Sequence, residues 1–196
     1  MKIIGLCGGS GSGKGAVSGI FAEIGIPSID TDAVYREMTL SDSPCMRALR
    51  REFGEEVVNS LGGLDRTRLA SIVFSDPTRL EKLNKIAHSF ILDETRRRLA
   101  EYRDKGLAAA IVDAPVLFES GFASECDAII CVVADRETRI ARIMSRDGIS
   151  YDAAEKRIAS QMKDEILISK CDHVIYNNAD IESLREGILS LKNKLI

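Results

Sequence analysis

Short apolar runs alternate with longer charged segments along the chain, and this rhythm predicts parallel strands joined by crossover helices. Continuous apolar runs such as AAAIVD and AIICVV are typical of strands buried on both faces of a sheet, whereas one-sided strands alternate apolar and polar residues. Pieces of buried helix are the alternative interpretation, which the shortness of the runs disfavours. The expected strands are Ile3–Cys7, Ser28–Asp30, Ala108–Asp113, Ala128–Val133 and His173–Tyr176.

The amphipathic segments predict helices, with Asp76 before Pro77 and Ser150 as expected N-caps. Between Tyr35 and Arg98 the charged segments run on without a strand signal, which predicts a helical subdomain that projects from the sheet and binds a substrate. With 196 residues and no recognisable linker, we expect a single domain over residues 1–196. The clearest helical ranges are 13–23, 76–105, 135–146, 150–163 and 180–194.

Composition narrows the class of protein. Hydrophobic residues make up 45% and charged residues 29%, as in ordinary globular proteins, and the net charge of −3 argues against a broad nucleic-acid surface. No apolar run approaches the roughly 20 residues needed to cross a bilayer, and no signal-peptide pattern opens the chain. Five scattered cysteines without paired spacing disfavour a disulfide framework or a zinc site, and they suit a reducing cytosol. We therefore expect a cytoplasmic protein that binds neither membrane nor nucleic acid.

A phosphate-binding loop is predicted at residues 8–14, GGSGSGK, which fit the first seven positions of G-x-x-x-x-G-K-[ST]. The segment follows an expected strand and opens an expected helix, so its backbone N–H groups and the positive helix end would attract phosphate oxygens. Lys14 would add a charge that reaches the β- and γ-phosphates. A glycine-rich turn without a ligand is the alternative, and a lysine has little structural purpose in such a turn.

The residue after Lys14 departs from this motif. Gly15 replaces the serine or threonine whose hydroxyl ordinarily binds magnesium, and Ala16 offers no hydroxyl either. Mg²⁺ keeps several waters and often relies on substrate phosphates, so we expect a water in place of the missing ligand.

Two carboxylates follow expected strands, at the sheet edge where ligands bind in α/β proteins. Asp32, in IPSIDTDAVYRE, is either the acceptor of a proton from an attacking hydroxyl or the N-cap of the next helix. Asp113 ends AAAIVD and is a candidate magnesium ligand, with a strand-terminal cap as the alternative. The next segment, APVLFESG, either lines a substrate pocket with Glu119 or packs against the core.

Arginines recur at helical spacing in the last third of the chain. Arg139, Arg142 and Arg146 share one helical face, and Arg157 with Gln161 repeats the four-residue spacing on the next helix. A helical hairpin of this kind would close over a nucleotide, and its guanidinium groups would neutralise charge on the transferring phosphoryl group. A solvated helix surface explains the stripe equally well.

The whole chain resembles the dephospho-CoA kinase family. The resemblance rests on GLCGGSGSGK, IDTDAVYRE, LDRTRLASIVFSDP, LNKIAHSFI, VDAPVLFESG, RIMSRDGISYDAAEKRIASQM and VIYNNAD, in family order from Ile3 to near the C-terminus. It implies a three-layer α/β fold of the P-loop kinase type with a five-stranded parallel sheet. It also implies a helical lid at about 139–165 and a helical CoA-binding part at about 35–105.

The resemblance implies transfer of the γ-phosphoryl group of ATP, with Mg²⁺, to the ribose 3′-hydroxyl of dephospho-CoA, giving coenzyme A and ADP. The catalytic residues would be Asp32, Lys14 and Arg142, and Asp113 would be a ligand of the metal ion. The nucleotide would be bound by Gly11, Ser12, Gly13, Lys14, Gly15, Ala16, Arg142, Arg146 and Asn177. The acceptor would be bound by Asp32, His88, Leu117, Phe118, Glu119, Arg157 and Gln161.

Two positions depart from the family pattern, Gly15 and Ser89, where a proline usually follows the histidine. Gly15 motivates an alternative in which the chain is a non-catalytic nucleotide-binding or regulatory module. A P-loop kinase that acts on another nucleoside or nucleotide is a further alternative. We expect a monomer or a small homo-oligomer whose partners are ATP and dephospho-CoA.

Overall fold

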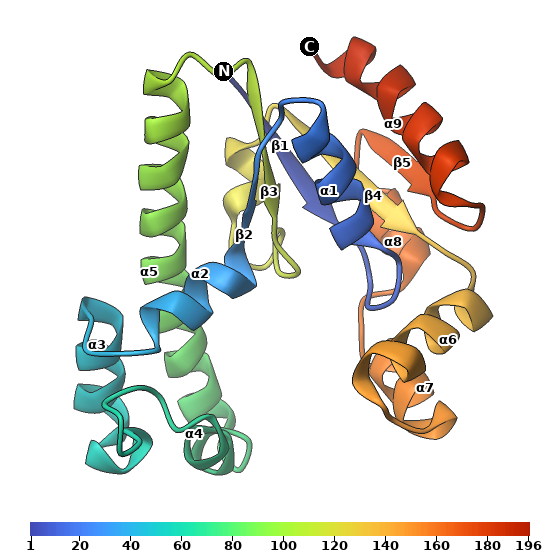
Figure 1. Ribbon diagram of the computed structural model, residues 1–196. Coiled ribbons are helices and arrows are strands. Elements are labelled where there is room, and N and C mark those ends of the chain that lie inside the picture. Colours follow the sequence, from blue (N-terminus) through green and yellow to red (C-terminus); the bar gives the residue numbers. More distant parts are fainter. The chain divides into compact units, whose positions relative to one another are not determined.

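A five-stranded parallel sheet in the order β2-β3-β1-β4-β5 organises the computed structural model, which describes residues 1–196 (Figure 1). The predicted α/β fold with a five-stranded parallel sheet is confirmed. Continuous apolar strands place residues such as Ile4, Ile111 and Ile130 in full burial. The strands are β1 (Lys2–Cys7), β2 (Ser28–Asp30), β3 (Ala109–Asp113), β4 (Ala128–Val133) and β5 (His173–Tyr176).

The chain divides into two compact units. The first contains Met1–Ile29 and Glu101–Ile196, and the second contains Asp30–Ala100. No helix of the structure has the length and apolar character needed to cross a bilayer.

In the first unit, the register of the central strands aligns their carboxyl ends. Leu6 of β1 is opposite Asp113 of β3, and Cys7 of β1 is opposite Cys131 of β4. Because the strands are parallel, the loops that follow them leave from the same edge of the sheet. Residues that are far apart in the sequence therefore come together at the edge of the sheet where β1 ends.

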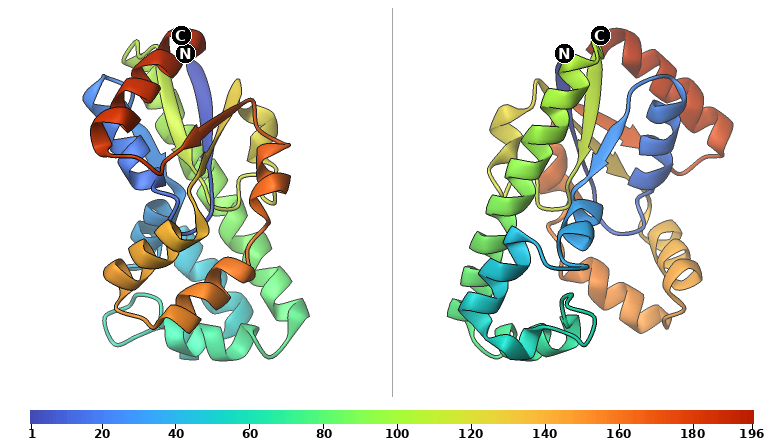
Figure 2. Two further views of the ribbon diagram at one scale, coloured as in Figure 1. Left: turned by 90° about the vertical axis from the view of Figure 1, so that its right-hand side faces the viewer. Right: turned by 60° about the vertical axis from the view of Figure 1, so that its left-hand side comes forward.

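Helices α1 (Lys14–Glu23) and α9 (Ile181–Leu195) pack together on one face of the sheet (Figures 1 and 2). Their apolar side chains, among them Phe21 and Ile188, join those of the strands in one buried cluster. The segment after β3, which includes the 3₁₀ helix η2 (Phe122–Glu125), packs closely against β1. A Cβ added to Gly5 would lie 2.8 Å from Leu117 Cδ2, so a larger residue would have to displace the Leu117 side chain.

Helices α6 (Arg136–Asp147) and α7 (Tyr151–Ala159) form a hairpin around Ile140, Ile143 and Ala154. The expected helix over 150–163 is too long, because α7 ends at Ala159 and a separate short helix, α8 (Asp164–Ile168), follows. Neither glycine nor proline marks this break in the sequence. The break frees the side chain of Gln161 to hydrogen-bond with Ser10.

The second unit is helical apart from one isolated bridge between Val58 and Leu64. Its buried core combines Leu49, Phe53 and Leu69 with other apolar side chains of α3, η1 and α4. The substrate-binding role predicted for this region stays a prediction. Its helices are α2 (Thr31–Met38), α3 (Pro44–Phe53), the 3₁₀ helix η1 (Glu55–Val57), α4 (Arg66–Val73) and α5 (Pro77–Asp104), whose last residues belong to the first unit.

The N-caps were predicted well except at α2. Ser150 accepts the N–H of Ala153, and Asp76 accepts that of Thr78, as expected. At α2, however, Asp30 is the cap: its Oδ1 accepts the N–H groups of Asp32 at 2.8 Å and Ala33 at 3.0 Å. The alternative that made Asp32 the N-cap is wrong, and Asp32 lies in the first turn of the helix.

Replacing Asp30 by alanine removes the acceptor for two N–H groups at the start of α2. We expect the free energy of unfolding, measured by urea denaturation, to fall by about 1 kcal/mol. Asp42→Ala is the control, because Asp42 makes only an exposed ion pair with Arg47, and we expect a loss below about 0.5 kcal/mol. Equal losses in the two variants would contradict the capping role.

Candidate active site

The predicted phosphate loop occupies residues 8–13, between the end of β1 and the start of α1. Gly13 has φ +96°, and a Cβ built there would lie 2.0 Å from Nδ2 of Asn177. A side chain at this position would suffer both backbone strain and a clash, so glycine is required. The loop thus packs against the residue that follows β5.

Asn177 and Arg142 bind the second half of the loop through its carbonyl oxygens. The buried Asn177 donates from Nδ2 to the Ser12 carbonyl at 2.8 Å. Arg142 of α6 donates from Nη1 to the carbonyls of Gly11 and Ser12, both at 3.3 Å. It also donates from Nη2 to the carbonyl of Asn177 at 3.1 Å. These bonds hold the end of β5, helix α6 and the loop together.

Arg139 and Gln161 bind the first half of the loop. Arg139, only 4% exposed, donates from Nε to the Ser10 carbonyl at 2.9 Å and from Nη1 to both carboxylate oxygens of Asp164 at 3.0 and 2.9 Å. Gln161 accepts the Ser10 N–H at 2.9 Å and donates to the Ser10 hydroxyl at 3.0 Å. Arg139 and Arg142 are therefore not part of a solvated stripe.

The loop's donors point to an anion site. While carbonyls of Ser10, Gly11 and Ser12 accept bonds from side chains, the N–H groups of Gly13, Lys14 and Gly15 meet no acceptor within the protein. These N–H groups lie at the positive end of α1, where anions are stabilised. The Ser12 hydroxyl is also buried without a hydrogen-bond partner. The arrangement suits phosphate oxygens.

Lys14 and Asp113 lie side by side at the base of the loop. Lys14 Nζ donates to the Gly8 carbonyl at 3.2 Å and lies 3.9 Å from Asp113 Oδ1. Both side chains are mostly buried, and the register of β1 and β3 places Asp113 beside the end of β1, where the loop begins. An amine and a carboxylate at this place suit a triphosphate and a hard metal ion, respectively.

Gly15 lies in the first turn of α1 with a normal helical backbone, and no atom lies within 4 Å of a Cβ built there. Gly15 and its neighbour Ala16 are both exposed. The space beside Gly15 is thus large enough for a hydroxyl side chain or for water.

Arg146 and Arg157 do not reach the loop in this structure. Both ion-pair with Asp147 at the turn between α6 and α7. Hydrogen bonds from Arg146, and then from Arg157, lower the pKa of Asp147 to about 2. The exposed carboxylate of Asp147 therefore links α6 to α7.

The other residues that are predicted to bind the acceptor substrate lie in different parts of the structure. Leu117 is fully buried and packs on β1, as the packing alternative anticipated, while Glu119 is exposed. The ring of Phe118 lies 5.2 Å from the ammonium group of Lys170. Asp32 and His88 belong to the second unit, in α2 and α5.

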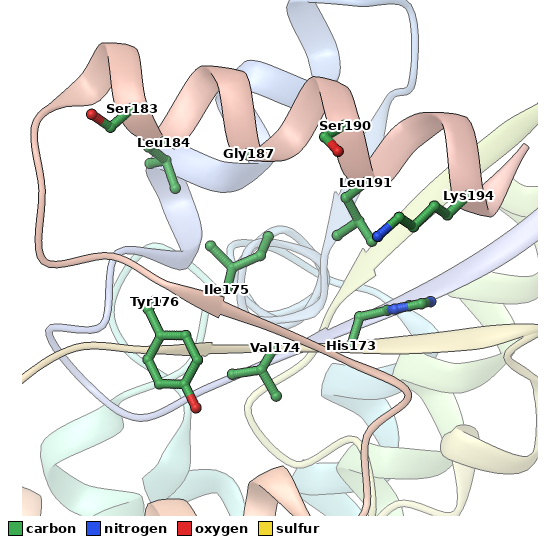
Figure 3. Close-up of a pocket in the computed structure, with 10 residues that line it drawn as sticks. All are labelled: His173, Val174, Ile175, Tyr176, Ser183, Leu184, Gly187, Ser190, Leu191 and Lys194. Atoms are coloured by element: carbon green, nitrogen blue, oxygen red, sulfur yellow. The ribbon is translucent and has the colours of Figure 1, made fainter.

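A separate cavity of about 290 Å³ lies between β5 and α9, as Figure 3 shows. It is lined by His173, Tyr176, Ser183 and Lys194 among others, and none of the predicted site residues contributes to it. The phosphate loop is accordingly the better candidate for catalysis.

The fold and the loop define the class of protein, a P-loop kinase. A shikimate kinase from Acinetobacter baumannii has the same fold, with a TM-score of 0.57 at 17% identity over 100% of this chain and 96% of that one. Residues 2–183 match the family model described as Dephospho-CoA kinase. The chain belongs to the dephospho-CoA kinase family.

Relatives support this membership along the whole chain. A dephospho-CoA kinase of Symbiobacterium thermophilum is 39% identical over 96% of this chain and 79% of that protein. One from Geobacter sulfurreducens is 39% identical over 96% of this chain and 95% of that protein. A Thermus thermophilus protein of known structure is 31% identical and superposes with a TM-score of 0.80, covering 100% of this chain and 98% of that one.

The sequence predictions did not include Arg139, Ser10 and Asp164 among the site residues. Arg139 belongs to the arginine stripe, so the spacing indicated which face of the helix it lies on but not that its side chain is buried. Asp164 was expected just after a helix that in fact ends earlier, and it carries no local signal.

Arg139→Met keeps the apolar stem of the side chain but removes the donors to Ser10, Gln161 and Asp164. We expect the free energy of unfolding in urea to fall by about 2–3 kcal/mol, because a buried charge network loses its centre. Arg136→Met, on the same helix, removes an exposed arginine and is expected to cost about 0.5 kcal/mol or less. If both variants were equally stable, the loop would not depend on Arg139.

Proposed function

We propose that this protein transfers the γ-phosphoryl group of ATP to the ribose 3′-hydroxyl of dephospho-CoA, which yields coenzyme A and ADP. The observation that carries the proposal is the match to the dephospho-CoA kinase family over residues 2–183, together with a phosphate loop whose Lys14 and Asp113 are paired. An assay for coenzyme A with purified protein, ATP, Mg²⁺ and dephospho-CoA tests it. Absence of product from folded protein at every magnesium concentration would overturn it.

The loop would bind the phosphates of ATP from one side. The unbonded N–H groups of Gly13, Lys14 and Gly15 supply donors, and Ala16 follows them in the same turn. The Lys14 ammonium adds a full positive charge close by. Because the loop is already held through its carbonyls, little reorganisation accompanies binding, which favours electrostatic catalysis.

Asp113 would hold Mg²⁺ directly or through water, and the metal would neutralise charge on the β- and γ-phosphates. Oxygen donors fit this ion: Asp113 supplies a carboxylate, and the open space at Gly15 admits a water where other loops place a hydroxyl. Magnesium binding would then depend more on Asp113 and on the phosphates themselves.

Asp32 would accept the proton of the ribose 3′-hydroxyl as its oxygen forms a bond to the γ-phosphorus. The bond between that phosphorus and the bridging oxygen breaks at the same time, and ADP departs with the electron pair. Asp32 is suited to this role because its carboxylate is exposed and lies in the first turn of α2.

Arg142 would neutralise negative charge that develops on the transferring group. Its guanidinium already contacts the loop carbonyls of Gly11 and Ser12, so its positive charge would act on bound phosphates from that position. Arg146 would reach the nucleotide only by leaving Asp147, for example when the hairpin of α6 and α7 closes. Asn177 would keep its bond to Ser12 and present the rest of its amide to adenine.

We assign the binding of the acceptor to the residues for which the sequence predicts this role. They are Asp32, His88, Leu117, Phe118, Glu119, Arg157 and Gln161. We further propose that the protein acts in the cytoplasm as a monomer or a small homo-oligomer. Comparing nucleosides with dephospho-CoA as acceptors tests whether another nucleoside is the substrate.

Asp32→Asn removes the proton acceptor while keeping the size of the side chain. We expect kcat for coenzyme A formation to fall by about 100-fold or more, with little change in unfolding. Asp30→Asn is the matched control two residues away, because asparagine also caps helices well, and it should keep most of the activity. Unchanged turnover in Asp32→Asn would remove Asp32 from the catalytic role.

Gly15→Ser restores the hydroxyl at the usual magnesium position. Since no atom lies within 4 Å of a Cβ at Gly15, the serine should fit without disturbing the loop, and half-maximal activity should need severalfold less Mg²⁺. Gly19→Ser is the control on the same helix, because Gly19 is also exposed and has open space around it. An identical magnesium dependence in parent and Gly15→Ser would show that the hydroxyl is not needed.

A further inference from the structure

Three cysteines meet within the first unit, although they are 40 or more residues apart in sequence. The sulfur atoms of Cys7, Cys131 and Cys171 all lie within 4.8 Å of one another, and Cys7 Sγ is 3.4 Å from Cys171 Sγ. Cys7 ends β1, Cys131 lies opposite it in β4, and Cys171 comes just before β5. The sequence predicted no metal site from the cysteine spacing, because the parallel register that joins them is not visible in spacing.

The three thiols differ in exposure. Cys7 and Cys131 are almost completely buried, whereas Cys171 is partly exposed and gives an ion a route to the cluster. All three are free, so no disulfide occupies the sulfurs. Hydrogen bonds from the thiols of Cys131 and Cys7 lower the pKa of Cys171. A sulfur that is readily ionised lies at the accessible side of the cluster.

The sulfur distances fit a metal better than a disulfide. A Zn–S bond of about 2.3 Å in tetrahedral geometry separates two sulfur ligands by about 3.8 Å, which lies inside the observed range. A disulfide needs about 2.05 Å, would use two of the three sulfurs and would leave the third without a role. Small rotations about the Cα–Cβ bonds would bring the three sulfurs around one ion.

The surroundings oppose ionisation of the two buried thiols, so the bound cation itself must supply the compensating charge. Hydrogen bonding to Cys171 and burial raise the pKa of Cys131 to about 12, and hydrogen bonding to Cys131 raises that of Cys7. Arg139 is already paired with Asp164, so its charge balances a thiolate only in part. A divalent cation would compensate most of the charge of three thiolates.

We propose that Cys7, Cys131 and Cys171 form a binding site for a thiophilic d¹⁰ cation of the Zn²⁺ class, held by three thiolates. Each thiol that becomes a ligand releases its proton to solvent, and no electron transfer is involved. Thiolate sulfur selects such soft cations over Mg²⁺, so this site and the proposed Asp113 site would bind different metals. A bound ion would join β1 and β4 to the chain before β5, directly beneath the phosphate loop.

The test uses the full-length protein, reduced and freed of metal. Zn²⁺ is titrated in competition with a chromophoric chelator, and Cd²⁺ is added separately so that sulfur-to-cadmium charge-transfer absorption reports the thiolate ligands. Cys171→Ser removes the exposed ligand with little risk to folding. Cys126→Ser is the matched control, because Cys126 is also partly exposed and each variant retains four cysteines.

We expect one tightly bound Zn²⁺ per chain in the parent and in Cys126→Ser, protection of three thiols from a thiol reagent, and no displacement by Mg²⁺. Cys171→Ser should bind at least about 10–100-fold more weakly, since losing a ligand costs no less than losing an outer-shell partner. Zn²⁺ should also raise the unfolding temperature of the parent but not of Cys171→Ser. Equal zinc affinity in parent and Cys171→Ser, or Cd²⁺ binding without the sulfur absorption, would overturn the proposal.

Discussion

The hydrogen bonds from Arg139 and Arg142 to the carbonyl oxygens of the phosphate loop are the constraint on which the rest of the site depends. A loop of six residues between a strand and a helix has as many acceptors as donors, and only its donors suit an anion. By binding the carbonyls of Ser10, Gly11 and Ser12, the two guanidinium groups leave N–H groups at the start of α1 available. The two guanidinium groups therefore hold the loop through its carbonyl oxygens, and the N–H groups at the start of α1 stay available for an anion.

This constraint links the loop to the hairpin of α6 and α7. Arg139 and Arg142 lie on α6, and Gln161 follows α7, so the hairpin and the loop share one hydrogen-bond network. Any movement of the hairpin over a nucleotide must either keep these bonds or exchange them for bonds to phosphate. The exposed pairs of Arg146 and Arg157 with Asp147 cost much less to break, because solvent screens them. Arg146 and Arg157 can therefore leave their partner at a lower cost in free energy than Arg139 and Arg142 can leave the loop.

Sequence reasoning succeeded wherever the signal was local. Strands with continuous apolar runs, the glycines before Lys14, and caps such as Ser150 depend on neighbouring residues only. Sequence reasoning was less precise where two nearby residues suit the same role. Both Asp30 and Asp32 suit an N-cap, and in the folded chain Asp30 has the extended backbone of the cap position. The early end of α7 at Ala159 was missed because no glycine or proline marks it, and the bonds between Gln161 and Ser10 form only in the folded chain.

The sequence by itself determined the family, the parallel α/β architecture and the phosphate loop with its missing hydroxyl, because these follow from short motifs and from the period of apolar residues. Only the tertiary structure decided that Arg139 is buried against Ser10 and that Cys7, Cys131 and Cys171 share one point in space. The physical reason is the register of a parallel sheet. Crossover connections of variable length bring strand ends together, so distance along the chain carries no information about which side chains meet there.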